Sequence, residues 1–242
     1  MRTSRKYRRD TIEESYRDVN IDGISKWRQE TLREMSLYCT NIPEIQNDLI
    51  SVTESIIANN IPGDVVECGV FLGGSIMTSM HTLKKHNNTT PVWLFDTFDG
   101  VPVPEAFEVD HDGTSLRDYY LKNRLIDGKS FWCYSNLETV KENVNTVGYK
   151  GEINYIKGLV EDTIPSNGPE SISILRIDVD LALPTLHILE HFYDRVVPGG
   201  YIIFDDYGYF KETQRIIDEF LLDKSMTVNS ILPGHHVYKG QK

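Results

Sequence analysis

The stretch SISILRIDVD, residues 171–180, alternates polar and apolar side chains, becomes apolar, and ends with Asp178 and Asp180. A second apolar run, YIIFDDYGYF over residues 201–210, leads in the same way into an Asp-Asp pair. Runs of this length and composition predict β-strands. Two strands that end in acidic residues predict either a metal site or two ordinary strand-to-loop turns.

Strands and helices alternate on both sides of this stretch. Strands are predicted at residues 64–70, 91–98, 152–158, 171–180 and 199–207. The helical segments between and after them cover residues 74–86, 136–149, 184–197 and 212–222. Five βα units in a row predict parallel strands joined by right-handed crossovers. The predicted fold class is therefore α/β, with an open, doubly wound, Rossmann-like sheet.

The two ends of the chain differ from this pattern. Residues 42–60 have apolar side chains near helical spacing, which predicts a helical extension before the first strand. Residues 225–233 and 235–240 predict a closing antiparallel hairpin around Pro233-Gly234, which makes the mostly parallel sheet seven-stranded. We expect two parts: residues 1–60, with a basic N-terminal arm and the helical extension, and residues 61–242, the catalytic domain.

Composition limits the classes of partner. The 242 residues include 36 acidic and 25 basic side chains, a formal net charge of −11, which argues against a nucleic-acid partner. The three cysteines are far apart and form no disulfide or zinc pattern, so we expect a cytoplasmic protein. No apolar run approaches the roughly 20 residues of a membrane helix, and the basic start MRTSRKYRRD lacks the apolar core of a secretory signal.

The first strand leads into a glycine-rich turn, in the stretch VVECGVFLGGS of residues 65–75. Gly69, Gly73 and Gly74 permit backbone conformations that a side chain forbids and let a ligand approach closely. The spacing matches neither G-x-G-x-x-G nor a P-loop. Glu67 would repel a pyrophosphate but suits a cation, and S-adenosylmethionine (SAM) carries a sulfonium and an ammonium group.

Two further strand ends agree with a nucleoside-like ligand. Asp96 ends the second strand, 27 residues after Gly69, where an acidic side chain can accept hydrogen bonds from ribose hydroxyls. Gly158 ends the third strand and permits close approach of an adenine. Each feature is weak alone, and the agreement of three successive strand ends is what favours a SAM site.

The fourth and fifth strands of such a sheet are commonly neighbours, so their terminal acids converge beside the glycine-rich turn. Asp178, Asp205 and Asp206 would then repel one another strongly unless a cation lies between them. Oxygen ligands select Mg²⁺, Mn²⁺ or Ca²⁺ over zinc. Asp180 is a weaker alternative ligand, and the structural alternative is that Asp180 or Asp206 merely caps a turn.

Five stretches in order, VVECGVFLGGS, LFDTFDGVP, KGLVEDTIP, LRIDVD and GGYIIFDDY, resemble the macrocin-type (TylF/MycF) sugar O-methyltransferases. The resemblance covers about residues 60–225 and implies a class I SAM methyltransferase fold, with SAM and Mg²⁺ (or Mn²⁺) as cofactors. It implies a homo-oligomer whose acceptor is a sugar or polyol hydroxyl of a natural product or glycan.

By position, the resemblance implies a set of cofactor contacts at the methionine, ribose and adenine parts of SAM: Glu67, Gly69, Val70, Phe71, Ser75, Asp96, Gly158, Val160 and Glu161. It implies Asp178, Asp205 and Asp206 as metal ligands. Asp178 is also our candidate for the proton acceptor, because a sugar hydroxyl is too weak an acid to ionise unaided and a bound metal would stabilise the developing alkoxide.

Several alternatives remain open at this point. Catechol methyltransferases carry a lysine where this chain has Leu181, which favours a sugar acceptor over a phenol without excluding the phenol. A nucleotide-dependent oxidoreductase or a catalytically silent SAM-binding protein on the same fold are further alternatives. His111, His235 and His236 are candidate bases, and residues 100–135 are a candidate substrate lid.

Overall fold

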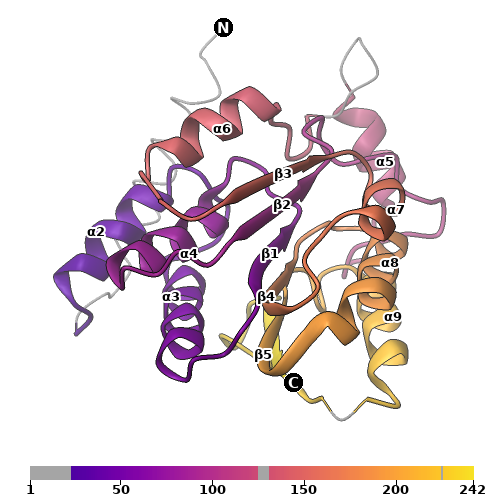
Figure 1. Cartoon of the computed structure of the whole chain (residues 1–242). Helices are drawn as coiled ribbons and strands as arrows, with labels where there is room; N and C mark the ends of the chain where they lie inside the picture. Colours follow the sequence, from indigo (N-terminus) through magenta and orange to yellow (C-terminus); the bar gives the residue numbers. More distant parts are fainter. Residues whose placement is uncertain (1–22, 125–130, 225) are drawn as a thin grey trace, which may run out of the picture.

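The computed structural model describes residues 23–124, 131–224 and 226–242. The basic arm expected at the N-terminus lies outside these residues. A seven-stranded sheet runs through the centre, in the order β3-β2-β1-β4-β5-β7-β6, with helices on both faces (Figure 1). The α/β prediction, with its doubly wound sheet, is confirmed. None of the helices in the described ranges has the length and apolar character needed to cross a membrane.

The strands explain why the sheet is only mostly parallel. Their bounds are β1 Asp64–Cys68, β2 Val92–Asp96, β3 Ile153–Lys157, β4 Ile172–Ile177, β5 Val196–Phe204, β6 Val228–Ser230 and β7 Tyr238–Gln241. The first five pair in parallel. β7 pairs antiparallel to both β5 and β6, as expected for the closing hairpin.

Helices cover the sheet as two layers. The longer described helices are α2 Lys26–Met35, α3 Pro43–Ala58, α4 Gly74–Lys85, α6 Leu137–Asn145, α8 Ala182–Phe192 and α9 Lys211–Leu221, and the shorter ones are α5 Leu116–Lys122 and α7 Val160–Thr163. Apolar side chains of α2, α3, α4 and α6 form one core cluster with the sheet. Those of α7, α8 and α9 form a second cluster on the other face.

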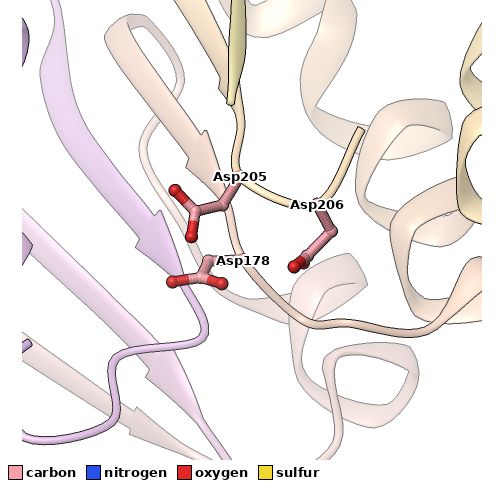
Figure 2. Close-up of side chains that lie close together, drawn as sticks. All are labelled: Asp178, Asp205 and Asp206. Carbon is pink, nitrogen blue, oxygen red and sulfur yellow. The ribbon is translucent and has the colours of Figure 1, made fainter. Parts of the chain in front are cut away.

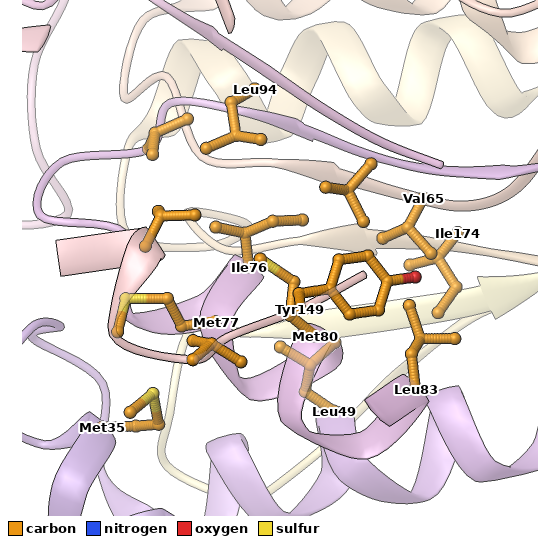
Figure 3. Close-up of a cluster of buried hydrophobic side chains, with 14 of the residues drawn as sticks. Met35, Leu49, Val65, Ile76, Met77, Met80, Leu83, Leu94, Tyr149 and Ile174 are labelled. Carbon is orange, nitrogen blue, oxygen red and sulfur yellow. The ribbon is translucent and has the colours of Figure 1, made fainter. Parts of the chain in front are cut away.

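The N-terminal helices contribute to the central core. Met35 of α2 and Leu49 of α3 belong to the same buried cluster as Val65 of β1 and Ile174 of β4 (Figure 3). Full burial of such side chains stabilises a fold by about 1.5–3 kcal/mol each. The helical extension therefore packs against the sheet that carries the strand-end residues.

Strand register places the predicted site residues side by side at the same edge of the sheet. Cys68 of β1 is the register partner of Ile177 in β4, which in turn pairs with Phe204 of β5. The residues that follow these strands continue the ladder, because the Asp178 N–H donates to the Cys68 carbonyl at 2.8 Å and the Asp205 N–H to the Ile177 carbonyl at 3.0 Å. Aspartates far apart in sequence thus leave the sheet side by side.

The end of β4 differs from the sequence prediction. The strand stops at Ile177 rather than at Asp180, whose φ of 63° is left-handed. The Leu181 N–H then donates to the Val179 carbonyl at 2.6 Å, which turns the chain toward α8. Helix α8 begins at Ala182, two residues before the predicted start, and Pro184 lies in its first turn, where no backbone donor is required.

Candidate active site

An open cavity lies at the carboxyl ends of β1, β2, β3, β4 and β5, where a doubly wound sheet binds its ligands. All twelve residues predicted for the cofactor and metal sites line it: Glu67, Gly69, Val70, Phe71, Ser75, Asp96, Gly158, Val160, Glu161, Asp178, Asp205 and Asp206. Five strand ends that are remote in sequence therefore share one space.

Close packing around the turn leaves no room for a side chain at two of its glycines. A Cβ on Gly69 would lie 1.7 Å from the carbonyl oxygen of Asp178, and its φ of +85° is left-handed. A Cβ on Gly74 would lie 2.6–2.8 Å from atoms of Tyr38 and Cys39. These glycines allow the turn to contact β4 and the N-terminal segment directly, a reason that the sequence pattern alone did not reveal.

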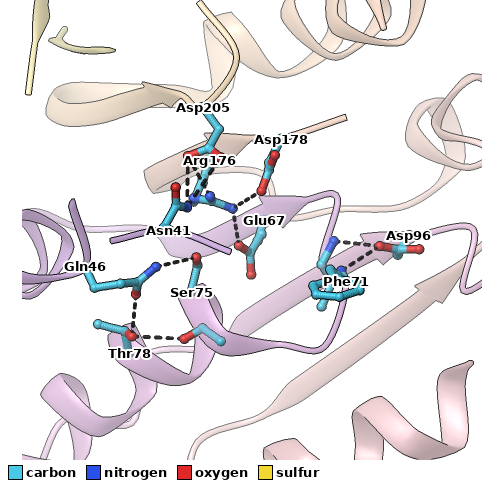
Figure 4. Close-up of polar contacts among 12 residues, drawn as sticks. Asn41, Gln46, Glu67, Phe71, Ser75, Thr78, Asp96, Arg176, Asp178 and Asp205 are labelled. Carbon is cyan, nitrogen blue, oxygen red and sulfur yellow. Dashed lines mark hydrogen bonds and ion pairs between the residues drawn. The ribbon is translucent and has the colours of Figure 1, made fainter. Parts of the chain in front are cut away.

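Asp96 organises the same turn. Its carboxylate accepts a hydrogen bond from the backbone N–H of Phe71 at 3.1 Å (Figure 4). It also accepts from the N–H groups of Val70 at 2.6 Å and Phe98 at 2.6 Å. An ionised carboxylate has about four acceptor sites. A fourth, longer contact comes from Thr97 Oγ1, 3.4 Å from Oδ1, and the same hydroxyl lies 2.8 Å from the Gly100 carbonyl oxygen. A ribose hydroxyl would therefore take the place of the Thr97 contact, and in this structure the side chain mainly holds the backbone.

Ser75 is fixed by the N-terminal segment. Gln46 of α3 donates from Nε2 to Ser75 Oγ at 2.9 Å and accepts from Thr78 Oγ1 at 2.7 Å (Figure 4). All three side chains are buried. The start of α4, which faces the cavity, is thus held in place by α3.

The three metal candidates converge. One carboxylate oxygen from each of Asp178, Asp205 and Asp206 lies within 4.8 Å of the others, and Figure 2 shows the three groups around a common space. Burial, reinforced by the neighbouring acids, raises the pKa of Asp178 and of Asp206 well above the ordinary value. A cation between them would remove this penalty on the charged forms.

Asp180, the weaker alternative ligand, has a different position. It is not part of the converging group, and its backbone N–H donates to Asp206 Oδ2 at 3.1 Å. Burial, followed by the charges of Asp205 and Asp96, raises its pKa to about 7. Asp180 therefore supports the orientation of Asp206.

Arg176 is the principal site residue that the sequence analysis missed. Its guanidinium is buried and lies 2.7 Å from Asp178 Oδ2 and 2.7 Å from Asp205 Oδ1 (Figure 4). These pairs engage one oxygen of each carboxylate. One arginine lies among these carboxylates and Glu67, so full ionisation of the four acids would leave negative charge in excess. The signal was available, because arginine is almost never fully buried in an apolar strand unless it is paired.

Glu67 completes this charge cluster. Its Oε1 lies 2.6 Å from Arg176 Nη1, whereas Oε2 is buried without a hydrogen-bond partner among the described residues. Burial raises the pKa of Glu67 to about 7, an effect that the charge of Arg176 opposes. An unpartnered buried oxygen on a cavity wall fits a cationic donor such as the ammonium group of SAM.

The donor set also fits a divalent metal. Carboxylate oxygens are the ligands of hard cations such as Mg²⁺ and Mn²⁺, and the described cluster contains no sulfur or imidazole ligand. The negative charge that these acids carry in excess of Arg176 when they are ionised would attract a cation. The residues present therefore fit both groups that the sequence predicted, side by side in one cavity.

The candidate histidine bases lie elsewhere. None of His111, His235 and His236 is among the residues that line the cavity. His111 packs against Tyr209 and His236, with ring centroids 4.7 Å and 5.7 Å away, and burial lowers the pKa of His236. Within the candidate lid, Val101 and Pro102 line the cavity, and residues 125–130 lie outside the described residues.

A second set of missed residues comes from the segment between α2 and α3. Tyr38, Cys39, Thr40 and Asn41 form one wall of the cavity. The Tyr38 carbonyl accepts a hydrogen bond from the Gly74 N–H at 3.2 Å. No periodicity or motif marks this segment, so only the fold reveals it.

Comparison with known proteins agrees with this architecture. The sequence profile of the family described as macrocin-O-methyltransferase (TylF) matches residues 40–231. The chain is 31% identical over 163 residues to mycinamicin III 3''-O-methyltransferase of Micromonospora griseorubida, covering 66% of this chain and 61% of the relative. It is 30% identical over 169 residues to demethyldecarbamoylnovobiocin O-methyltransferase of Streptomyces niveus, covering 69% and 61%.

A third relative names a sugar. The chain is 32% identical over 157 residues to 8-demethyl-8-(2,3-dimethoxy-alpha-L-rhamnosyl)-tetracenomycin-C 4'-O-methyltransferase of Streptomyces olivaceus, covering 64% of this chain and 57% of the relative. The chain thus spans about three-fifths of the length of the relatives it matches.

Solved structures show the same fold. The O-methyltransferase NovP superposes with a TM-score of 0.73 at 24% identity, covering 98% of both chains. The calicheamicin methyltransferase CalS11 superposes with a TM-score of 0.65 at 15% identity, covering 96% of this chain and 91% of the other.

Proposed function

The chain belongs to the macrocin-O-methyltransferase (TylF) family, and on this basis we propose that it transfers a methyl group from SAM to a sugar hydroxyl of a small-molecule acceptor. The convergence of Asp178, Asp205 and Asp206 beside Glu67 in one cavity is the observation that carries the proposal. The name of the relative from Streptomyces olivaceus, which specifies a rhamnosyl compound, supports a sugar as the acceptor.

Two groups of residues would hold the cofactors. Glu67 and the turn from Gly69 to Ser75 would bind the methionine end of SAM, Asp96 its ribose, and Gly158 to Glu161 its adenine. Asp178, Asp205 and Asp206 would hold Mg²⁺ or Mn²⁺. When bound there, the cation would supply Lewis acidity toward the acceptor hydroxyl.

The protein's own contribution is positioning and proton transfer. Asp178 is our candidate to accept the hydroxyl proton, because it lies in the cavity. Arg176 Nη1 holds its Oδ2 at 2.7 Å, and Oδ1 would accept the proton. Leu181, at the position of the catechol enzymes' lysine, is buried against Leu116 and Phe210, so no lysine base stands there.

The test is methyl transfer with the purified chain. SAM is supplied with Mg²⁺ and a panel of glycosylated acceptors, a catechol and a sugar-free control, and S-adenosylhomocysteine (SAH) and methylated product are measured by mass spectrometry. We expect product only with vicinal-diol sugars and none after EDTA treatment. Product from the catechol alone, or full turnover in excess EDTA, would refute the acceptor class or the metal requirement respectively.

Calorimetry distinguishes the proposed methyltransferase from the alternative, a nucleotide-dependent oxidoreductase. We expect binding of SAM and SAH and no binding of NAD, because the turn lacks the G-x-G-x-x-G spacing. Tight binding of NAD without binding of SAM would favour an oxidoreductase.

A further inference from the structure

Asn41, in the segment between α2 and α3, contacts one of the converging carboxylates. Its Nδ2 lies 3.2 Å from Asp205 Oδ1 and 3.4 Å from Asp205 Oδ2 (Figure 4). The two residues are 164 positions apart, and both line the cavity. The contact joins the N-terminal segment to the predicted metal site.

Asp205 has two polar neighbours of different character, an ion-pair partner and a hydrogen-bond donor. Arg176 Nη2 approaches Oδ1 at 2.7 Å with a permanent charge, and Asn41 approaches both oxygens with a neutral amide. A guanidinium has only donors, whereas an asparagine amide has a donor nitrogen and an acceptor oxygen of nearly the same shape. Rotation of the terminal amide by half a turn exchanges the two without moving the backbone.

The orientation of this amide depends on what lies next to Asp205. With carboxylates alone in the cluster, the amide N–H groups are the favourable end to present. Beside a divalent cation the opposite end is favourable, because Asn side-chain carbonyls are ordinary ligands of hard cations. The neutral Asn41 amide is thus suited to accompany a cation, a role that the adjacent guanidinium cannot take.

We infer that Asn41 is a metal-site residue that the N-terminal segment supplies, its Oδ1 serving as a further oxygen donor to the cation held by Asp178, Asp205 and Asp206. This inference rests on the metal site of the proposed function. It adds a neutral ligand to three carboxylates, from a part of the chain that carries no recognisable motif.

Calorimetric titration of the full chain with Mg²⁺, in the presence of SAH, tests this role. Asn41→Leu keeps the approximate volume and removes both polar ends, and Asn41→Asp keeps an oxygen. We expect Asn41→Leu to weaken Mg²⁺ binding about tenfold, the lower end of the loss seen when a metal site loses a supporting group. Asn41→Asp should bind Mg²⁺ at least as tightly as wild type.

The controls separate local from general effects. Asn145→Leu, at an exposed position of α6, should leave Mg²⁺ binding unchanged. SAH affinity and the melting temperature of Asn41→Leu should stay near wild-type values. Equal or tighter Mg²⁺ binding by Asn41→Leu would overturn the role of Asn41 alone. Absence of Mg²⁺ binding by the wild-type chain would overturn the metal site itself, and this inference with it.

Discussion

Arg176 of β4 and Glu67 of β1 are register partners on adjacent parallel strands, and the guanidinium Nη1 lies 2.6 Å from the carboxylate Oε1. Both side chains are buried, with exposed fractions of 5% and 2%. Such a pair is held by mutual attraction, but removal of one partner leaves the other charge uncompensated in a medium of low dielectric constant. Because Arg176 also contacts Asp178 and Asp205, this pair connects the predicted cofactor and metal subsites.

Replacement of Arg176 tests that connection through stability. We expect Arg176→Met to lower the free energy of unfolding by about 3–5 kcal/mol, the usual loss when a buried ion pair is broken from one side. Urea unfolding followed by circular dichroism measures it. The control is Arg215→Met, because Arg215 is half-exposed and pairs with Glu212 and Glu219 on the surface. That change should leave the free energy of unfolding nearly unchanged, because exposed ion pairs contribute little. Equal losses would contradict the role of the buried pair.

Substitutions at two glycines with the same backbone conformation distinguish the cost of backbone strain from the cost of a steric contact. Gly69 and Gly234 have φ values of +85° and +84°, but only Gly69 has a neighbour that a Cβ would meet, the Asp178 carbonyl oxygen at 1.7 Å. We expect Gly234→Ala to cost about 1–2 kcal/mol from the left-handed backbone alone. Gly69→Ala should cost more than about 4 kcal/mol and shift Asp178. Thermal unfolding of both variants measures the two costs. Similar melting temperatures would show that the β1–β4 contact is easily relaxed.

Removal of one carboxylate charge tests the metal site. Asp206→Asn preserves the acceptor for the Asp180 N–H and removes a negative charge from the cluster. Loss of even a supporting residue weakens a metal site about 10–100-fold, so we expect Mg²⁺ affinity to fall by about 100-fold and methyl transfer to fall with it. Titration calorimetry measures the affinity, and Asp223→Asn, at an exposed position after α9, is the control. Unchanged Mg²⁺ binding by Asp206→Asn would exclude this residue as a ligand.

Cys39 should be an unreactive thiol despite its place on the cavity wall. Although Cys39 keeps some exposed surface, desolvation by the surrounding protein raises its pKa to about 12 from an ordinary value of 9.0, and its Sγ lies 3.4 Å from the Met35 carbonyl oxygen. The folded state therefore favours the protonated thiol. The stabilisation that this pKa shift gives the folded state is fully present below pH 9. It is lost as the pH rises from about 9 toward 12.

Alkylation at pH 8, followed by peptide mass spectrometry, checks this state. Cys39 should react at least about tenfold more slowly in the native protein than in urea, because the thiolate is the nucleophile. Cys39→Ser should flatten the decrease in stability between pH 8 and pH 10.5. Rapid native labelling at pH 8 would contradict the raised pKa.

Most of the fold was predictable from local patterns. The apolar runs at β1, β2, β4 and β5 and the intervening helical segments predict a doubly wound sheet, because parallel strands buried on both faces have few alternatives. The boundaries were less accurate, since β4 ends at Ile177 and not at Asp180. That difference arises from the tight turn at residues 179–181, where the Asp180 N–H donates to Asp206 Oδ2 and the Asp180 carbonyl accepts from Thr213 Oγ1 of α9.

The candidate site was predictable where a residue's place in a strand determines its place in the fold. Asp178, Asp205 and Asp206 follow apolar strands directly, so the parallel register brings them to one edge. Arg176 and Asn41 were missed for a different reason. Arg176 pairs with Asp178 two residues away but also with Glu67 109 residues away, and Asn41 contacts Asp205 164 residues away. Each contact depends on where a long or a loop-borne side chain is directed after packing.

The sequence by itself therefore determined the order of strands and helices, and through it the edge of the sheet where the acids and the glycine turn meet. Only the tertiary structure decided which of those acids pair with an internal arginine and which segment forms a further wall of the cavity. The physical reason is that backbone patterns are set by neighbouring residues, whereas charge pairing in a buried site is set by strand register and by the packing of segments remote in sequence.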